Sequence, residues 1–141
     1  TVLIAEDEAG VLNVARIILE TQGYTVLAAE SGTAAAQIAS EYPGTIHMLL
    51  TDVIMPDFGG RELVQLVRSH RPEVRVIYMS GYTDDAVVRS GVESSREWLI
   101  QKPFTPLALA KRVRDALSRD MPRLLDRNDE PFATRPITAE P

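Results

Sequence analysis

Five side chains that could do chemistry each stand at the end of a short apolar run. Glu6 and Asp7 follow "TVLIA", Asp52 follows "IHMLLT", Ser80 closes "VRVIYMS" and Lys102 follows "EWLIQ". Taken singly, each has an ordinary explanation as a first-turn acid, a capping residue, a loop residue or a surface charge. If the ends of these runs meet, however, two or three carboxylates lie together, and their repulsion must be relieved by protonation or by a cation.

This set of residues favours phosphoryl transfer. Oxygen-only ligands indicate a hard divalent ion such as Mg²⁺, held by carboxylates and water and completed by a phosphate. A carboxylate oxygen of Asp52 could then attack phosphorus and leave an acyl phosphate. Lys102 and the ion would stabilise charge on the phosphoryl oxygens, to one of which the Ser80 hydroxyl could donate.

The apolar runs themselves are predicted strands. Branched residues are frequent in 1–5, 24–29, 46–51, 74–80 and 97–101, and the segments between them have helical periodicity. Regular alternation of strand and helix predicts an α/β fold with a doubly wound, five-stranded parallel sheet covered by helices on both faces. Ligands of such sheets bind outside the carboxyl ends of the strands, which is where the reactive side chains are predicted to lie.

The helices are predicted from apolar spacing and end signals. Gly23 should close the first helix, Ser31 should cap the second, and Thr105 and Pro106 should begin the last. A shorter helix is predicted over 84–91. The residues expected to face the sheet are Val11, Leu12, Ala15, Ile18, Leu19, Leu63, Leu66, Val67, Leu109, Val113, Ala116 and Leu117.

Length and composition predict one domain, residues 1–119, followed by a flexible tail, 120–141. The chain has 141 residues, 45% of them hydrophobic, whereas the tail is rich in proline and has no sustained period. The absence of cysteine excludes disulfides and thiolate metal sites, and the net charge of −5 argues against direct nucleic-acid binding. Without a recognisable signal peptide or membrane span, we expect a cytoplasmic location and no membrane contact.

Four segments, "AEDE", "LLTDVIMPDFGG", "MSGYTDDAV" and "QKPFTPLALAKRVRDAL", resemble the receiver (response-regulator, CheY-like) domain family in the expected order. The resemblance spans residues 1 to about 119. It implies a flavodoxin-like sheet with strand order 2-1-3-4-5. It further implies these roles: Glu6 and Asp7 as the acidic pair for Mg²⁺, Asp52 as phosphoacceptor and metal ligand, the backbone carbonyl of Ile54 as a further ligand, Ser80 as the switch hydroxyl, and Lys102, followed by a cis Pro103, as the partner of the phosphoryl group.

One position departs from the family pattern. Receivers usually have Phe or Tyr three residues before the lysine, where the ring moves as the switch hydroxyl engages phosphate, but this chain has Leu99. Trp98 is adjacent, yet neighbouring side chains of a strand point to opposite faces. Phosphorylation would add roughly two negative charges, which could bias the segment around 80–91 between two arrangements. We also hypothesise that Ile54 and Tyr82 shield the acyl phosphate from water.

The same resemblance implies partners. The donor would be a phosphohistidine on a sensor histidine kinase or a histidine phosphotransfer domain, docking near the first helix and Asp52. The segment "MSGYTDDAVVRSG" with "WLIQKPFTP" is most similar to receivers at the C-terminus of hybrid sensor histidine kinases, so we favour that context over a free-standing single-domain regulator.

Two other functions are alternative hypotheses for this sequence. A phosphatase of the haloacid dehalogenase type would need a second acid two residues after the nucleophile, where this chain has Ile54. A pseudo-receiver that acts only as an interaction module would not need the acidic pair, Asp52, Ser80 and Lys102 together. A covalent phosphoryl adduct that depends on Asp52 separates the receiver from the pseudo-receiver, which would form none.

Overall fold

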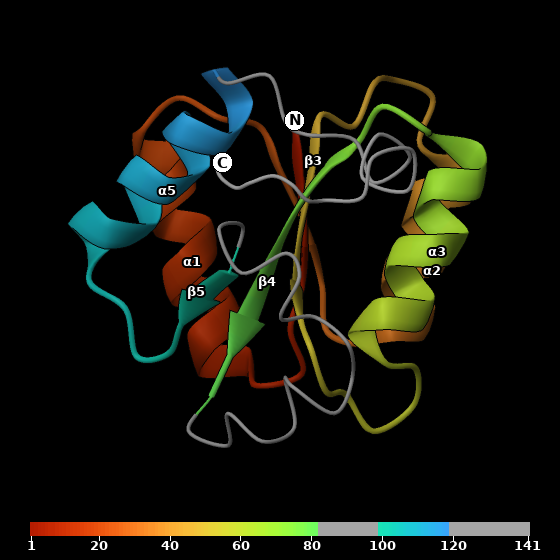
Figure 1. Ribbon diagram of the computed structural model, residues 1–141, viewed down its shortest axis with the longest axis horizontal. Coiled ribbons are helices and arrows are strands. Elements are labelled where there is room, and N and C mark those ends of the chain that lie inside the picture. The colour runs from red at the N-terminus through yellow and green to blue at the C-terminus, as the bar shows by residue number, and fades with distance from the viewer. Residues whose placement is uncertain (82–98, 119–141) are drawn as a thin grey trace, which may run out of the picture.

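Each of the five apolar runs forms a strand in the computed structural model (Figure 1), which describes residues 1–81 and 99–118. The central strands, β1 and β3, are buried along their whole length, as expected for strands with helices on both faces. The strands are β1 Val2–Ala5, β2 Val26–Ala29, β3 Met48–Asp52, β4 Arg75–Ser80 and β5 Leu99–Gln101.

All strand pairs are parallel, and their order is β2-β1-β3-β4-β5. This confirms both the predicted class and the order implied by the family resemblance. The chain goes to one side of β1 for β2 and to the other side for β3, so the strand order reverses between β1 and β3. The carboxyl ends of β1 and β3 therefore flank the crevice where this type of sheet binds ligands.

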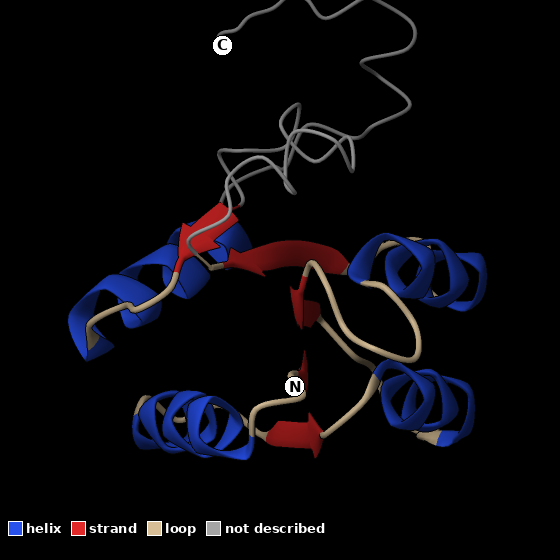
Figure 2. Cartoon of the chain, turned by 90° about the horizontal axis from the view of Figure 1, so that it is seen from below, coloured by secondary structure: helices blue, strands red, loops and turns tan. Residues whose placement is uncertain are grey.

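The helices form a layer on each face of the sheet. Figure 2 shows α1 (Ala9–Thr21) and α5 (Pro106–Ser118) on one face, and α2 (Gly32–Glu41) and α3 (Gly60–His70) on the other. The sheet is therefore doubly wound, as predicted. The helix predicted over 84–91 lies outside the described residues.

The predicted helix ends are confirmed where the structure describes them. The Ser31 hydroxyl accepts a hydrogen bond from the backbone N–H of Ala34 at 3.0 Å, and the Thr105 hydroxyl does the same for Ala108 at 3.0 Å. Pro106 is the first residue of α5. Gly23 follows α1 with a φ of 98°, the left-handed conformation in which glycine avoids a steric penalty.

One hydrophobic core lies between the sheet and each helix layer. Most of the residues predicted to face inward belong to one of these two cores. Val11 and Leu66 are exceptions, because both are only half-buried and belong to neither core. Val64, close to Leu66, is 3% exposed, so α3 is rotated slightly from the predicted face. The buried members of the α1/α5 core are Val2, Ile4, Leu12, Ala15, Leu19, Met48, Leu50, Ile77, Met79, Ile100, Leu109, Val113 and Ala116. Those of the α2/α3 core are Leu3, Ala5, Ala29, Ala35, Ala39, Ile46, Leu49, Val53, Met55, Leu63, Val64, Val67, Val74, Val76 and Tyr78.

Arg71, at the end of α3, joins the two helices of one layer. Its guanidinium donates to the backbone carbonyl oxygens of Ala39 at 3.0 Å, Tyr42 at 2.7 Å and Gly44 at 2.7 Å. These acceptors lie in the last turn of α2 and in the segment after it, where helix carbonyls lack partners. Arg71 thus fastens the C-terminal ends of α2 and α3 together.

Candidate functional site

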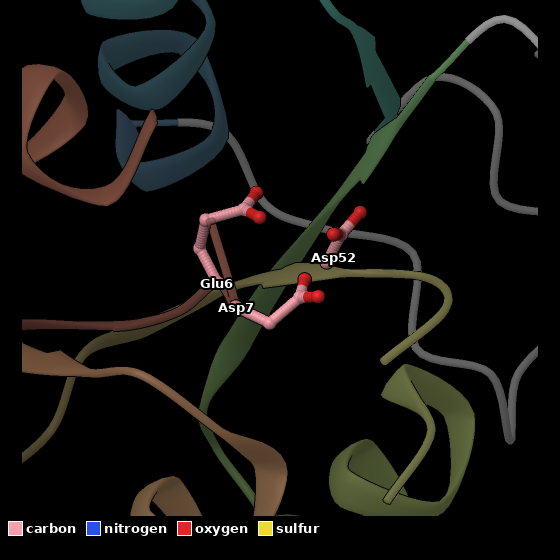
Figure 3. Close-up of side chains that lie close together, drawn as sticks. All are labelled: Glu6, Asp7 and Asp52. Carbon is pink, nitrogen blue, oxygen red and sulfur yellow. The ribbon is translucent and has the colours of Figure 1, made fainter. Parts of the chain in front are cut away.

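Three carboxyl groups lie close together at the carboxyl edge of the sheet (Figure 3). Glu6 and Asp7 come directly after β1, and Asp52 is the last residue of β3. One oxygen from each carboxylate can be chosen so that all three atoms lie within 4.8 Å of one another. The predicted convergence of these acids is therefore present in the structure.

Lys102 lies between two of these acids, directly after β5. Its Nζ is 3.1 Å from Oε1 of Glu6 and 3.2 Å from Oδ2 of Asp52. Glu6 is fully buried, and its other oxygen, Oε2, accepts a hydrogen bond from the backbone N–H of Glu8 at 3.0 Å. Glu6 thus holds the lysine ammonium as well as contributing to the acidic group, a contact that its place in the sequence did not predict.

Burial and charge give Asp52 an unusual acidity. Removal from solvent and the nearby carboxylate of Glu6 raise the pKa of Asp52 to about 7, although Lys102 opposes the change. For Lys102, burial lowers the pKa, but the hydrogen bond from its ammonium to Glu6 and the charge of Asp52 outweigh burial and raise it overall. The lysine is therefore charged at neutral pH. The negative charge of ionised Asp52, by contrast, is only partly balanced by Lys102.

The donor set fits a hard divalent cation. Three carboxylates face a single ammonium group, so the cluster has excess negative charge when all its members are ionised. Asp7 is exposed, which leaves the cluster open to solvent on one side. Carboxylate oxygens with room for water are the ligands that Mg²⁺ prefers.

Ser80 lies at the same edge of the sheet, where its hydroxyl bonds to the adjacent backbone. It is 3% exposed, and its hydroxyl donates to the backbone carbonyl of Gly81 at 3.3 Å. The backbone N–H of Lys102 donates to the Ser80 carbonyl at 2.6 Å, and the Lys102–Pro103 peptide bond is cis, as the resemblance implied. The ends of β4 and β5 are thus tied together beside the acidic group.

Leu99 and Ile54 occupy different surroundings. Leu99 is half-buried at the start of β5, pairs with Tyr78 of β4 and packs against the α2/α3 core. The side chain of Ile54 is 58% exposed in the loop after β3. Tyr82 and Trp98, which entered the sequence predictions, lie outside the described residues.

Asp57, in the same loop, was not predicted to take part in the site. Its carboxylate accepts hydrogen bonds from the first turn of α2: from the backbone N–H groups of Gly32 at 3.3 Å and Thr33 at 3.0 Å, and from the Thr33 hydroxyl at 2.7 Å. An acid after a proline is typical of a turn, and no local signal indicates a contact with residues 24 and 25 positions earlier.

The parallel sheet, its strand order and the acids and lysine at its carboxyl edge define a CheY-like domain of the flavodoxin type. The model of the family described as "Response regulator receiver domain" matches residues 2–114. The chain belongs to this family, whose members act in two-component signalling.

Relatives of different architecture share this domain. The chain is 34% identical over 119 residues to the sensor kinase CckA of Brucella abortus, covering 84% of this chain and 13% of the kinase. It is 33% identical over 120 residues to the aerobic respiration control protein ArcA of Escherichia coli K12, covering 85% of this chain and 49% of that protein. It also matches the crystal structure of the receiver domain from the hybrid histidine kinase CckA with a TM-score of 0.67 and 33% identity, covering 83% of this chain and 98% of that one. This chain thus spans at most about half of these curated relatives.

Proposed function

We propose that the domain accepts a phosphoryl group on Asp52 from a phosphohistidine and changes conformation as a result. The observation that supports this most directly is the buried carboxylate of Asp52, at the end of a central strand and 3.2 Å from the Lys102 ammonium. An oxygen of Asp52 attacks phosphorus and forms a new P–O bond. The P–N bond to the donor imidazole breaks, and its electron pair stays on the imidazole nitrogen, which then takes up a proton.

The residues have separate roles in this step. Glu6, Asp7 and Asp52, with the backbone carbonyl of Ile54, would hold Mg²⁺, which when bound neutralises charge on the phosphoryl oxygens. Lys102 pairs with the Asp52 carboxylate before transfer and with the added phosphoryl group after it. The Ser80 hydroxyl exchanges the Gly81 carbonyl for a phosphoryl oxygen, and Leu99, beside Tyr78, takes the position where most receivers use an aromatic ring.

The test looks for a covalent phosphoryl adduct on the protein. The protein is incubated with acetyl phosphate and Mg²⁺ and examined by intact mass spectrometry. We expect an increase of about 80 Da, which disappears in Asp52→Asn. Asp115→Asn, the same chemical change at an acid paired with Lys111 on α5, is the matched control and should keep the adduct. Absence of the adduct from the unchanged protein would contradict phosphoacceptor function and favour a scaffold role.

We further propose that the domain is part of a hybrid sensor histidine kinase and works in the cytoplasm without contacting membrane or nucleic acid directly. The similarity to CckA supports the kinase context, whereas the similarity to ArcA keeps a separate response regulator as the alternative. Among the helices within residues 1–81 and 99–118, none has the length and apolar character of a membrane span. The coding sequence upstream of Thr1 decides the architecture, since a kinase ATP-binding domain there would support the hybrid.

A further inference from the structure

The loop that follows Asp52 is attached to the protein at three places. At its base, the backbone N–H of Gly60 donates to the Val53 carbonyl at 2.9 Å. In its middle, Met55 is 5% exposed and belongs to the α2/α3 core. At its far side, Asp57 accepts the hydrogen bonds from Gly32 and Thr33. Ile54 lies between the first two attachments.

The third attachment is the unusual one because it depends on a single exposed side chain. Both carboxylate oxygens of Asp57 are used, and the hydrogen bonds from Thr33 lower its pKa to about 2, so the group is charged across the neutral range. A negative charge at the first turn of a helix also interacts favourably with the helix dipole. Asp57 therefore joins the loop to α2 through charge-assisted hydrogen bonds.

The backbone of the loop also packs closely against the start of α2, at Gly32. A Cβ atom added at Gly32 would lie 2.4 Å from the Phe58 carbonyl oxygen, so the loop rests directly on the first turn of α2. Such an approach is possible only for glycine at position 32. The hydrogen bonds of Asp57 and the close approach at Gly32 together hold the loop against the first turn of α2.

We propose that Asp57 is a positioning residue for the metal site. It acts through the loop, by holding the segment that carries the Ile54 carbonyl in the arrangement that Mg²⁺ requires. The inference rests on the proposed function, because it assumes that the acidic group binds this ion. Replacing a residue that orients metal ligands without touching the metal typically lowers the affinity for the metal by about 10–100-fold.

The test measures Mg²⁺ binding directly, by isothermal titration calorimetry on the full chain without any phosphodonor. We expect Asp57→Ala to raise the Kd for Mg²⁺ about tenfold, with Asp57→Asn in between because its amide oxygen still accepts a hydrogen bond. Thr33→Val, which removes the hydroxyl donor and keeps the backbone N–H, should raise the Kd by a smaller factor.

Ser31→Ala is the matched control. Ser31 caps the same turn of α2 through Ala34 and does not bond to the loop, so its loss should lower stability without changing the Kd. Urea unfolding in EDTA measures stability for every variant. The inference is overturned if Asp57→Ala binds Mg²⁺ as the unchanged protein does, or if Ser31→Ala raises the Kd equally. An unchanged protein that binds no Mg²⁺ would instead overturn the proposed metal site, and this inference with it.

Discussion

The Asp52 carboxylate lowers the stability of the folded domain when it ionises. Its folded pKa is about 7, whereas an unfolded aspartate titrates near 3.9, so the folded state binds the extra proton between roughly pH 4 and 7. The free energy of unfolding should therefore fall as pH rises through this window.

We predict that Asp52→Asn is more stable than the unchanged protein above pH 7 in EDTA, by about 1–3 kcal/mol. The asparagine removes the buried negative charge and leaves Lys102 paired with Glu6. Urea unfolding at pH 5 and pH 8 measures the difference, which should shrink at the lower pH. A stability difference that does not depend on pH would show that charge is not its cause.

Ile54 lies two residues after Asp52 with its side chain 58% exposed, so replacing it should disturb packing little. We predict that Ile54→Asn shortens the lifetime of the acyl phosphate, because a polar side chain admits and orients water that isoleucine excludes. Loss of the phosphoryl adduct after donor removal, followed by mass spectrometry, gives the rate. An unchanged rate would mean that Ile54 does not shield the site.

The sequence predicted which acids and which lysine would meet, because parallel strands place their carboxyl ends at one edge. It did not predict that Glu6 would bind Lys102, since that contact joins positions 96 residues apart and depends on side-chain geometry. The contact of Asp57 with α2 was missed for the same reason. Contacts of this kind arise only when the complete fold brings two loops together.

Among the elements, α1 has apolar side chains that the core does not use. Val14 and Ile17 are 50% and 49% exposed on the helix that the resemblance assigns to partner docking. We predict that Val14→Glu combined with Ile17→Glu slows phosphorylation by a protein phosphohistidine donor at least tenfold, because buried apolar contacts are lost.

The same double variant should accept phosphate from acetyl phosphate at the original rate, since α1 keeps its inward residues. The comparison of the two donors therefore separates docking from chemistry. Equal slowing with both donors would indicate damage to the site, and no slowing with either would place the docking surface elsewhere.

At position 32, in the first turn of α2, there is no room for a side chain larger than the hydrogen of glycine. We predict that Gly32→Ala destabilises the domain by about 1–3 kcal/mol, because the new methyl group meets the Phe58 backbone, which must shift. Gly10→Ala in α1 is the control: nothing lies within 4 Å of the added Cβ, so stability should be unchanged or slightly higher. Denaturant unfolding of both variants checks the contrast, and equal effects would contradict it.

The strands and helices were predictable to within a few residues because apolar runs and caps are local signals. The exact ends were not: β3 begins two residues later than predicted and includes Asp52, since pairing with β4 extends to Met79. The rotation of α3 that buries Val64 rather than Leu66 likewise depends on how the helix settles against its neighbours.

For the whole molecule, the core residues that the structure describes all precede residue 119. The buried ones extend from Val2 to Ala116, while 119–141 lie outside the description. We propose residues 1–119 as the folding unit and predict that a chain ending at Asp120 keeps its free energy of unfolding within about 0.5 kcal/mol. Guanidinium unfolding compares the two lengths. Unfolding of the shorter chain would show that the remainder packs on the domain.

The attachment by Arg71 has a consequence for how the domain opens. Arg71 fastens α2 and α3 at their C-terminal ends, and Asp57 joins α2 to the segment leading into α3 at the other end. Neither helix can then detach alone without breaking hydrogen bonds to its neighbour. In native-state hydrogen exchange, the backbone amides of the two helices would open as a single cooperative unit with a common free energy.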